Sequence, residues 1–252
     1  MQVTDLLKML SKNFAYLSKA PSQKGVFEMT KVRSFIVGTG LLSKIFYRLI
    51  RSIVLLFSRA YLRLKVYGSE NIPVDGAFIV APIHRSNVDT PLASAITKRR
   101  LRFMGKDSLW KNKQIGAILS ALGGFPVTRG SADLEALRRC LDVLSQGEPL
   151  VMFPEGTRQS GPLIHPLFDG AAYLAIKAQV PIVPVGFGGT EGVMPKGSKM
   201  IYPKRCSIVV GAPIFPPSTS TGRLPRSATS DLTAQLSQAL QQVFDLARAK
   251  SQ

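Results

Sequence analysis

The feature that most constrains the fold is a repeated alternation of short apolar runs with amphipathic helical patterns, which begins near residue 63. Runs such as PLVMF and PIVPVGF carry no charged residue, as expected for strands that are buried on both faces of a parallel sheet. This alternation predicts an α/β fold, with a mostly parallel central sheet covered by helices on both faces. The segments expected to form strands are LRLKVYG, AFIVAPI, LRFMGK, residues 125–127, PLVMF, PIVPVGF and CSIVVGAPI.

Helical patterns fill the intervals between these runs. After residues 125–127, Ser131 is a suitable N-cap for a helix with a leucine stripe, and Gly147 is a suitable place for it to end. An amphipathic pattern, DLTAQLSQALQQVFDLARAK, closes the chain after a polar linker that contains prolines. The other segments expected to form helices in this part of the chain are residues 110–122 and 167–179.

The stretch LLSKIFYRLIRSIVLLFSRAYLRL, residues 41–64, is rich in apolar residues but is interrupted by lysines and arginines. Its longest uncharged run, from Ser52 to Ser58, is far shorter than the roughly 20 residues that a membrane-spanning helix needs. The pattern predicts a helix that lies flat in a membrane interface. The alternative is a buried helix whose arginines extend along its edges. The basic residues that can share one broad face are Lys44, Arg48, Arg51 and Arg59.

The charge balance indicates an anionic partner. The chain has 33 Lys and Arg against 15 Asp and Glu, a formal net charge of +18. Nucleic acid, an acidic lipid surface or a polyanionic substrate would each balance this charge. The two cysteines, Cys140 and Cys206, have no metal-binding spacing, and so few cysteines favour a reducing compartment. The first residues break their apolar run with lysines, so no secretory signal peptide is expected.

Polar residues follow the run AFIV in the stretch APIHRSNVDTPL, where His84 and Asp89 occur. Pro91 suits the first position of a helix, and it disfavours helical geometry at Thr90. His84 is therefore expected at the carboxyl end of a strand and Asp89 at the mouth of the next helix, where open α/β sheets bind ligands. A carboxylate on one imidazole nitrogen would leave the other free to accept a proton. The alternative is a structural histidine beside a capped helix.

Three later stretches complete a recognisable series: GGFPVTR at 123–129, FPEGTR at 153–158 and VPIVPVG at 180–186. With the preceding HX4D motif, their order and spacing resemble the glycerolipid acyltransferase family, most closely the 1-acyl-sn-glycerol-3-phosphate acyltransferases. The resemblance covers roughly residues 64–213. It implies a membrane-associated enzyme of phospholipid biosynthesis. The parts expected from it are an N-terminal membrane-association segment (1–62), a catalytic α/β domain (63–216), and a linker with a C-terminal helix packed on that domain (217–252).

The residue types suit acyl transfer to a phosphorylated alcohol. We expect His84 to accept the hydroxyl proton while the oxygen attacks a thioester, and Asp89 to stabilise the resulting imidazolium. No G-x-S-x-G sequence occurs and neither cysteine adjoins a histidine, so transfer without an acyl-enzyme is predicted. Two histidines and scattered acids give no ligand cluster, so we expect no metal and no resident cofactor.

Candidates for binding the substrate phosphate are Arg129 and Arg158, each at the end of an apolar run that contains glycine, and Lys106 at the end of LRFMGK. A guanidinium matches the geometry of a phosphate. The alternative for Arg158 is an ion pair with Glu155.

Within FPEGTR, we expect Glu155, Gly156 and Thr157 to shape the loop around the glycerol end of the substrate. His165, in the loop that follows, is expected to have a structural or pocket-edge role. The VPIVPVG stretch carries no polar side chain, so it is expected to be structural or to line the acyl site.

The sequence therefore predicts an acyltransferase on the cytoplasmic face of a membrane, where it would contact anionic lipids. It would move a fatty acyl group from acyl-CoA or acyl carrier protein to lysophosphatidate, forming phosphatidate. Glycerol-3-phosphate, another lysophospholipid and a glycolipid are alternative acceptors. A non-enzymatic protein that binds membranes or nucleic acid is a more remote alternative, because no nucleic-acid module is present.

Overall fold

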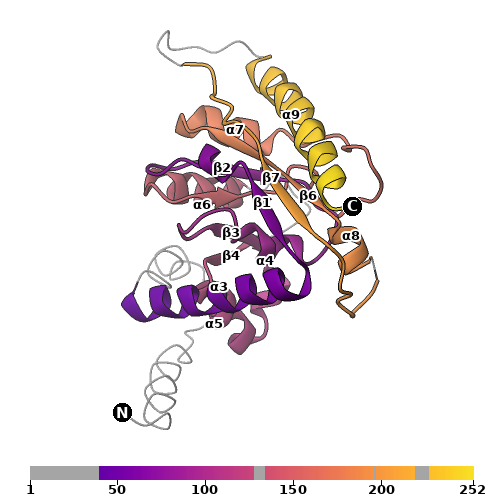
Figure 1. The fold of residues 1–252 in the computed structure, drawn as a ribbon. Helices are drawn as coiled ribbons and strands as arrows, with labels where there is room; N and C mark the ends of the chain where they lie inside the picture. Colours follow the sequence, from indigo (N-terminus) through magenta and orange to yellow (C-terminus); the bar gives the residue numbers. More distant parts are fainter. Residues whose placement is uncertain (1–39, 128–133, 196, 219–226) are drawn as a thin grey trace.

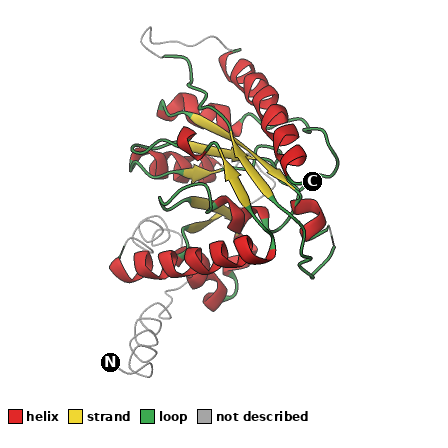
Figure 2. Ribbon diagram, in the orientation of Figure 1, coloured by secondary structure: helices red, strands yellow, loops and turns green. Residues whose placement is uncertain are grey.

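A central β-sheet is the frame of the molecule in the computed structural model, which describes residues 40–127, 134–195, 197–218 and 227–252 (Figures 1 and 2). Within these ranges seven strands pair in the order β1-β7-β6-β2-β5-β3-β4. The strands are β1 (Lys65–Tyr67), β2 (Ile79–Pro82), β3 (Arg102–Lys106), β4 (Gly124–Val127), β5 (Leu150–Val151), β6 (Ile182–Gly188) and β7 (Ser207–Val210).

All strand pairs in the described sheet are parallel except β6 with β7. The predicted mostly parallel sheet is therefore confirmed. Because β6, β2, β5, β3 and β4 run in the same direction, their carboxyl ends meet at one edge. This edge is where the conserved geometry of α/β sheets places ligand sites, and we call it the carboxyl edge.

Helices cover both faces of the sheet (Figure 1). On one face, α9 (Ala228–Lys250) contacts β6 and β7, while α7 (Gly170–Ala178) lies between α9 and α6 (Leu134–Ser145). On the other face, α3 (Leu41–Tyr61) contacts both α4 (Asp89–Ala93) and α5 (Lys113–Ala121). Short helical turns complete the described chain: η1 (Ser69–Asn71), η2 (Asp107–Trp110) and α8 (Thr190–Val193).

The α9 helix approaches the sheet unusually closely because β6 has glycines on the face that it covers. A Cβ at Gly186 would overlap the backbone carbonyl of Val243, and one at Gly188 would overlap that of Ala247. The contact seals this face of the core, and the closing helix therefore packs on the same body as the sheet. The α9 side chains that are buried there include Leu232, Leu236, Leu240 and Phe244.

Two helices begin elsewhere than the sequence suggests. The α4 helix begins at Asp89, so the expectation that Pro91 is its first residue and that Thr90 is non-helical is wrong. The preceding turn is held by the Asp89 carboxylate, and Pro91 is tolerated because the amide it lacks would have no intrahelical partner in a first turn. The segment 110–122 divides into η2 and α5, because the Asn112 side chain accepts hydrogen bonds from the backbone N–H groups of two α5 residues and caps that helix. The Ser131 cap lies outside the described residues.

The α3 helix lies across the lower face of the sheet, with one side against α4 and α5 (Figure 1). Tyr47 and Ser58 are buried on that side. Its outer side carries a stripe of large exposed apolar residues, of which Leu41 and Leu56 are more than 70% exposed. Among the helices of the described chain, none has an apolar stretch long enough to cross a bilayer. The members of this outer stripe are Leu41, Leu42, Ile45, Leu49, Ile53, Leu56 and Phe57.

Candidate active site

His84 and Asp89 meet at the carboxyl edge of the sheet. His84 follows the end of β2 by two residues, and Asp89 is the first residue of α4. The turn between them brings Nδ1 of His84 to 3.1 Å from Oδ2 of Asp89. The Asp89 side chain is fully buried, whereas 17% of the His84 side chain is exposed. The pair therefore has a carboxylate shielded from water and an imidazole that solvent or a substrate can reach.

The Asp89 carboxylate is fixed by the turn that it closes. Its Oδ2 also accepts the backbone N–H groups of Arg85 and Ser86, each at 2.6 Å. An ionised carboxylate only accepts hydrogen bonds, so Nδ1 of His84 donates and Nε2 carries the lone pair. The other oxygen, Oδ1, is buried without a partner among the described residues. Such an arrangement costs stability, but it holds the imidazole in the state that accepts a proton.

The imidazole ring is also held by packing and by its backbone. It stacks on Phe153, with 4.2 Å between ring centroids and 30° between ring planes. The backbone N–H of His84 donates to Oε2 of Glu155 at 3.2 Å, and its carbonyl accepts the N–H of Gln159 at 2.9 Å. The FPEGTR loop therefore binds directly to the backbone of His84, which fixes the relative positions of the two motifs.

Glu155 lies at the centre of a buried ion pair with Arg85. Nη1 of Arg85 donates to Oε2 of Glu155 at 2.7 Å, and both side chains are almost completely buried. The second carboxylate oxygen accepts the backbone N–H of His165 at 3.1 Å. The Arg85 guanidinium also donates to the carbonyl of Leu163 and lies 4.8 Å from the ring centroid of Phe244. Glu155 therefore joins three segments: the HX4D turn, its own loop and the loop that contains His165.

Arg85 is the site residue that sequence reasoning missed. The alternative considered there was an ion pair between Glu155 and Arg158, but the structure pairs Glu155 with Arg85 instead. The only available signal was that Arg85 directly follows His84 at the end of an apolar strand, where a charge must find a buried partner. That partner is 70 residues away in the chain, so no local pattern could identify it.

The loop after Glu155 requires glycine at one position. Gly156 has φ +70°, and a Cβ there would lie 2.7 Å from the ring of Phe168. Both the left-handed backbone and the close aromatic ring exclude larger residues. Thr157 is exposed, and its hydroxyl accepts a hydrogen bond from the Gln159 side chain at 3.1 Å. The turn directs the chain toward Arg158 at the same edge of the sheet as His84.

The candidate phosphate ligands are only partly described. Arg158 is half-buried and forms no ion pair with a carboxylate of the described residues, so its guanidinium is available to a ligand. Lys106 is the last residue of β3, at the carboxyl edge, but its side chain is outside what the structure describes. Arg129 lies outside the described residues. His165 is exposed, and it contacts the site through its backbone N–H, which donates to Glu155.

The cysteines have the properties of core residues. Burial, with a smaller contribution from the negative charge of Asp89, raises the pKa of Cys206 to about 12. A thiol with so high a pKa is almost entirely protonated near neutral pH and is a poor nucleophile. Cys140 is buried, with its Sγ 3.3 Å from Sδ of Met104. In the part of the chain that the structure describes, no three His, Cys, Asp or Glu residues are grouped to hold a metal.

An apolar cavity of about 230 Å³ opens beside the HX4D turn. Thr90 and Pro91, the residues that follow Asp89, form one end of it, and Tyr47 of α3 and Phe103 of β3 form its walls. Its other lining residues come from α3, from the ends of α4 and α5, and from β4, and they are mostly apolar; the polar ones are Arg51 and Ser94. A cavity of this kind accommodates a hydrocarbon group beside the residues that follow Asp89.

Comparison with known proteins identifies relatives of the whole arrangement. A family model described as "Acyltransferase" matches residues 63–188. The 1-acyl-sn-glycerol-3-phosphate acyltransferase of Bacillus subtilis (strain 168) is 32% identical over 153 residues, which are 60% of this chain and 73% of that protein. The chloroplastic 1-acyl-sn-glycerol-3-phosphate acyltransferase BAT2 of Brassica napus is 29% identical over 56% of this chain, and the match spans only 42% of the plant protein.

A solved structure has the same architecture. The crystal structure of the 1-acyl-sn-glycerophosphate (LPA) acyltransferase PlsC from Thermotoga maritima is similar with a TM-score of 0.67 and 26% sequence identity. The match covers 87% of each chain. The similarity therefore extends beyond the family-model region to most of the fold.

Proposed function

The chain belongs to the acyltransferase family, and from this premise we propose that it transfers a fatty acyl group from an acyl thioester to the free hydroxyl of lysophosphatidate, forming phosphatidate. The observation that carries the proposal is the contact between His84 Nδ1 and Asp89 Oδ2, which leaves Nε2 free at the carboxyl edge. Relatives named 1-acyl-sn-glycerol-3-phosphate acyltransferase support lysophosphatidate as the acceptor.

In this reaction His84 is the general base. Nε2 takes the proton from the acceptor hydroxyl while the oxygen attacks the thioester carbonyl. The carbon–sulfur bond then breaks, and the imidazolium returns the proton to the leaving thiolate. The buried Asp89 carboxylate stabilises the imidazolium between these steps. General-base assistance of this kind contributes about 100-fold to 10,000-fold in rate.

Arg158 is proposed to bind the acceptor phosphate, with Arg129 and Lys106 as further ligands. The support for Arg158 is its place on the loop that is bonded to His84 and its lack of a carboxylate partner among the described residues. A guanidinium binds a phosphate through two parallel hydrogen bonds, so it would orient the glycerol as well as hold it. Glu155, Gly156 and Thr157 shape this loop, because the Glu155 contacts and the Gly156 turn set its path.

The acyl chain is proposed to occupy the apolar cavity beside Thr90. Its opening next to Asp89 would place the thioester carbonyl near Nε2 of His84. Either acyl-CoA or acyl carrier protein supplies the thioester, and we propose no resident cofactor. Direct transfer without an acyl-enzyme is consistent with the raised pKa of Cys206, which leaves that thiol protonated near neutral pH.

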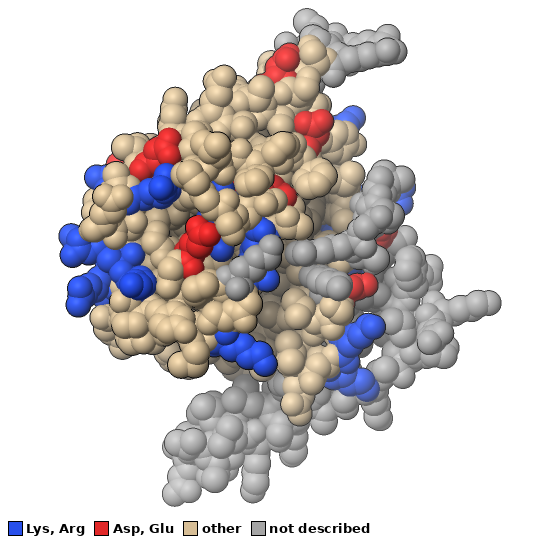
Figure 3. Space-filling view, turned by 90° about the vertical axis from the view of Figure 1, so that its right-hand side faces the viewer, with Lys and Arg blue, Asp and Glu red and all other residues tan. Residues whose placement is uncertain are grey.

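We further propose that the protein acts at the cytoplasmic surface of an anionic membrane. The exposed apolar stripe of α3 would enter the interface, as amphipathic interfacial helices do. The net charge of +18 would add attraction to acidic lipids. In the view of Figure 3, lysine and arginine side chains lie in several separate groups, the largest at the left edge, and acidic side chains lie between some of them.

The test is product analysis by mass spectrometry, with purified protein, mixed acceptors and mixed acyl donors. The acceptors are lysophosphatidate, glycerol-3-phosphate, lysophosphatidylcholine and an unphosphorylated monoacylglycerol. Phosphatidate as the main product, with no product from His84→Ala, is the expected result. Equal rates with the unphosphorylated acceptor would contradict the proposed role of Arg158. If the main product is not phosphatidate, the acceptor from which that product forms would take the place of lysophosphatidate in the proposal.

A further inference from the structure

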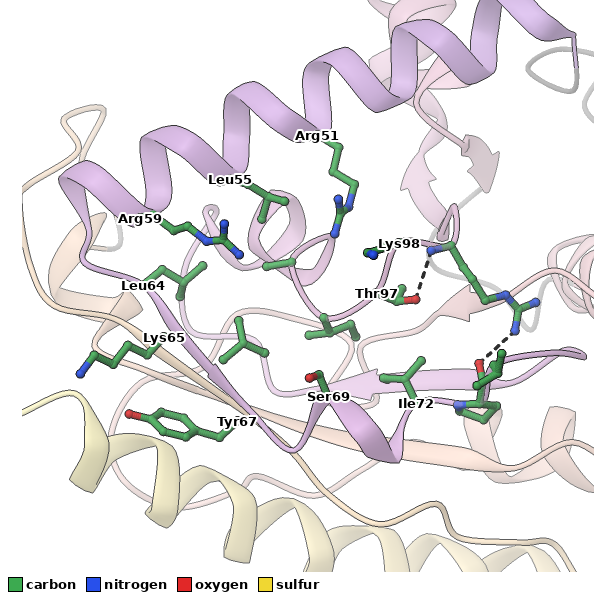
Figure 4. Close-up of a pocket in the computed structure, with 16 residues that line it drawn as sticks. Arg51, Leu55, Arg59, Leu64, Lys65, Tyr67, Ser69, Ile72, Thr97 and Lys98 are labelled. Atoms are coloured by element: carbon green, nitrogen blue, oxygen red, sulfur yellow. Dashed lines mark hydrogen bonds between the residues drawn. The ribbon is translucent and has the colours of Figure 1, made fainter.

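A second, larger hollow lies on the α3 face of the sheet, away from the catalytic histidine (Figure 4). It has a volume of about 740 Å³ and is formed by α3, by β1 with the loop that follows, and by residues 95–99. His84, Asp89, Glu155 and Arg158 are not among its lining residues. In the sheet, β7 and β6 separate β1 from β2, the strand that leads to His84.

Positive charges gather in this hollow. Arg51 and Arg59 extend from α3 toward the loop that carries Lys98, as Figure 4 shows. Lys65 and Arg99 also contribute to the lining, and no acidic residue does. None of these five side chains forms an ion pair with a carboxylate of the described chain. A hollow lined by one sign of charge concentrates ligands of the opposite sign.

Two of the arginines are held in place by the backbone. Nε of Arg51 donates to the carbonyl of Ser94 at 2.9 Å, which leaves its two terminal nitrogens toward the hollow. Arg99 donates to the carbonyls of Pro73 and Gly147. The hydrogen bonds of Arg99 reduce its capacity for a ligand, so Arg51, Arg59 and Lys98 are the cations most available to one. A fixed guanidinium loses less conformational entropy when it binds an anion.

The side of the hollow opposite α3 is largely apolar, with Leu64, Val66 and Ile72 among its residues. A site of cations with an apolar side matches a ligand that is both anionic and hydrophobic. The hollow also adjoins α3, whose outer side carries the exposed apolar stripe. A helix that lies in a membrane interface places the cations on its flank at the depth of the lipid headgroups.

From this juxtaposition we infer that the hollow is a binding site for the phosphate headgroup of an anionic phospholipid, separate from the His84–Asp89 pair. Arg51 also lines the smaller, apolar cavity, so it lies between the two cavities. Arg51, Arg59 and Lys98 bind the headgroup phosphate, and the apolar side contacts the glycerol and the first part of the acyl chains. The inference depends on the proposed membrane docking of α3, but not on which lipid is the acyl acceptor. Occupation of the hollow would fix how α3 sits on an anionic surface.

The test measures binding of a soluble short-chain lipid, so that general attraction to a charged surface does not contribute. Dihexanoyl-phosphatidylglycerol is titrated below its micellar concentration into the full chain, with dihexanoyl-phosphatidylcholine as the neutral probe. Calorimetry follows the wild type, the double variant Arg59→Gln/Lys98→Gln, and the matched double variant Lys44→Gln/Arg48→Gln. The matched variant removes the same charge from exposed positions of α3 that do not line the hollow.

We expect the wild type to bind the anionic probe more tightly than the neutral one. The Arg59/Lys98 variant should bind the anionic probe about 30-fold more weakly, the change that two contacts of about 1 kcal/mol each produce. The Lys44/Arg48 variant should resemble the wild type. Equal losses in the two variants, or no preference for the anionic probe, would overturn the inference.

Two further experiments identify the source of the anion and separate a failure of this inference from a failure of the proposed function. Coenzyme A and inorganic phosphate are titrated in the same way, and tighter binding of either at this site would replace the lipid with a soluble anion. Acyl transfer to lysophosphatidate in neutral detergent should be unchanged in both double variants. If the wild type itself transfers no acyl group to lysophosphatidate, the proposed function is contradicted. If the affinity for the anionic probe is the same with and without Arg59 and Lys98, only this inference is contradicted.

Discussion

The carboxyl edge and the α3 region of this protein use charged residues in opposite ways. At the carboxyl edge, Arg85 and Glu155 are buried against each other, and every carboxylate oxygen but one has a donor. Along α3, Arg51 and Arg59 border an open hollow and have no acidic partner among the described residues. The Arg85–Glu155 pair balances its own charges, whereas the cations around the hollow are not balanced by any carboxylate of the described residues.

The difference indicates that the Arg85–Glu155 pair positions the groups around it, whereas the cations along α3 are free to bind an anion. A buried ion pair seldom adds net stability, because desolvation offsets most of the attraction, but it imposes one geometry on the groups around it. The Arg85–Glu155 pair imposes that geometry on the His84 backbone and on the FPEGTR loop. Solvated cations around an open hollow cost little folding free energy and do not fix the geometry of their neighbours, since water screens their charges until an anion binds. Catalysis and membrane binding should therefore respond to different substitutions.

The variant His84→Ala should separate catalysis from membrane binding most strongly. Removing the base should lower kcat by about 100-fold to 10,000-fold, the usual contribution of general-base catalysis. Binding to anionic vesicles should be unchanged, because α3 is untouched. Turnover with lysophosphatidate and vesicle co-sedimentation are measured on the same preparation. Activity within tenfold of the wild type would mean that another group accepts the proton.

Arg85→Met should have the largest effect on stability. It leaves Glu155 buried without its charged partner, and breaking a buried pair costs about 3–5 kcal/mol. Arg158→Met is the matched control, because Arg158 is half-buried and has no ion pair with a described carboxylate. Urea unfolding should show a shift of the midpoint for the first variant only. Equal midpoints would mean that the Arg85–Glu155 pair does not hold the loops together.

Replacing two residues of the outer stripe, Ile53→Ser with Leu56→Ser, should weaken vesicle binding by about 10-fold to 100-fold. Each large apolar side chain that leaves water contributes roughly 1.5–3 kcal/mol, and interfacial burial is partial. Transfer to a lysophosphatidate dispersed in neutral detergent should remain, since both side chains are exposed and far from the HX4D turn in the chain. A parallel loss of activity in detergent would show that α3 also shapes the catalytic edge.

The smallest effect on turnover is expected from Cys206→Ala. Activity near pH 7 should stay within about twofold, because a thiol whose pKa is raised by burial is protonated and takes no part in acyl transfer. A large loss of kcat with unchanged stability would instead point to an acyl-enzyme on this residue.

The same variant tests the raised pKa of Cys206 through stability. The unfolded thiol ionises from about pH 9, while the folded thiol stays neutral until about pH 12. Because the unfolded state loses its proton first, the stability of the wild type should fall across this window as pH rises. The difference in unfolding free energy between wild type and Cys206→Ala should change there and be constant below it. A constant difference up to pH 11 would contradict the raised pKa.

Much of the fold was predictable because a buried strand appears in the sequence as a short run of apolar residues. Each expected apolar run contains a strand, and the mostly parallel pairing followed from the helices between the runs, whereas the order of the strands was not predicted. The helix starts were less accessible, since Asp89 begins α4 through hydrogen bonds to amides that precede it. For the site, the His84–Asp89 contact could be anticipated from the strand-to-helix junction. The Arg85–Glu155 pair could not, because its members have no sequence spacing that relates them.

The sequence by itself determined the parallel α/β architecture and the nearness of His84 to Asp89, because both depend on hydrophobic periodicity and on residues a single turn apart. Only the tertiary structure decided which arginine neutralises Glu155, that Cys206 is buried where the charge of Asp89 acts on it, and that cations from α3 and from residues 95–99 face one hollow. These facts depend on segments that meet through sheet order and helix packing. Such contacts correspond to no regular spacing of residues in the sequence.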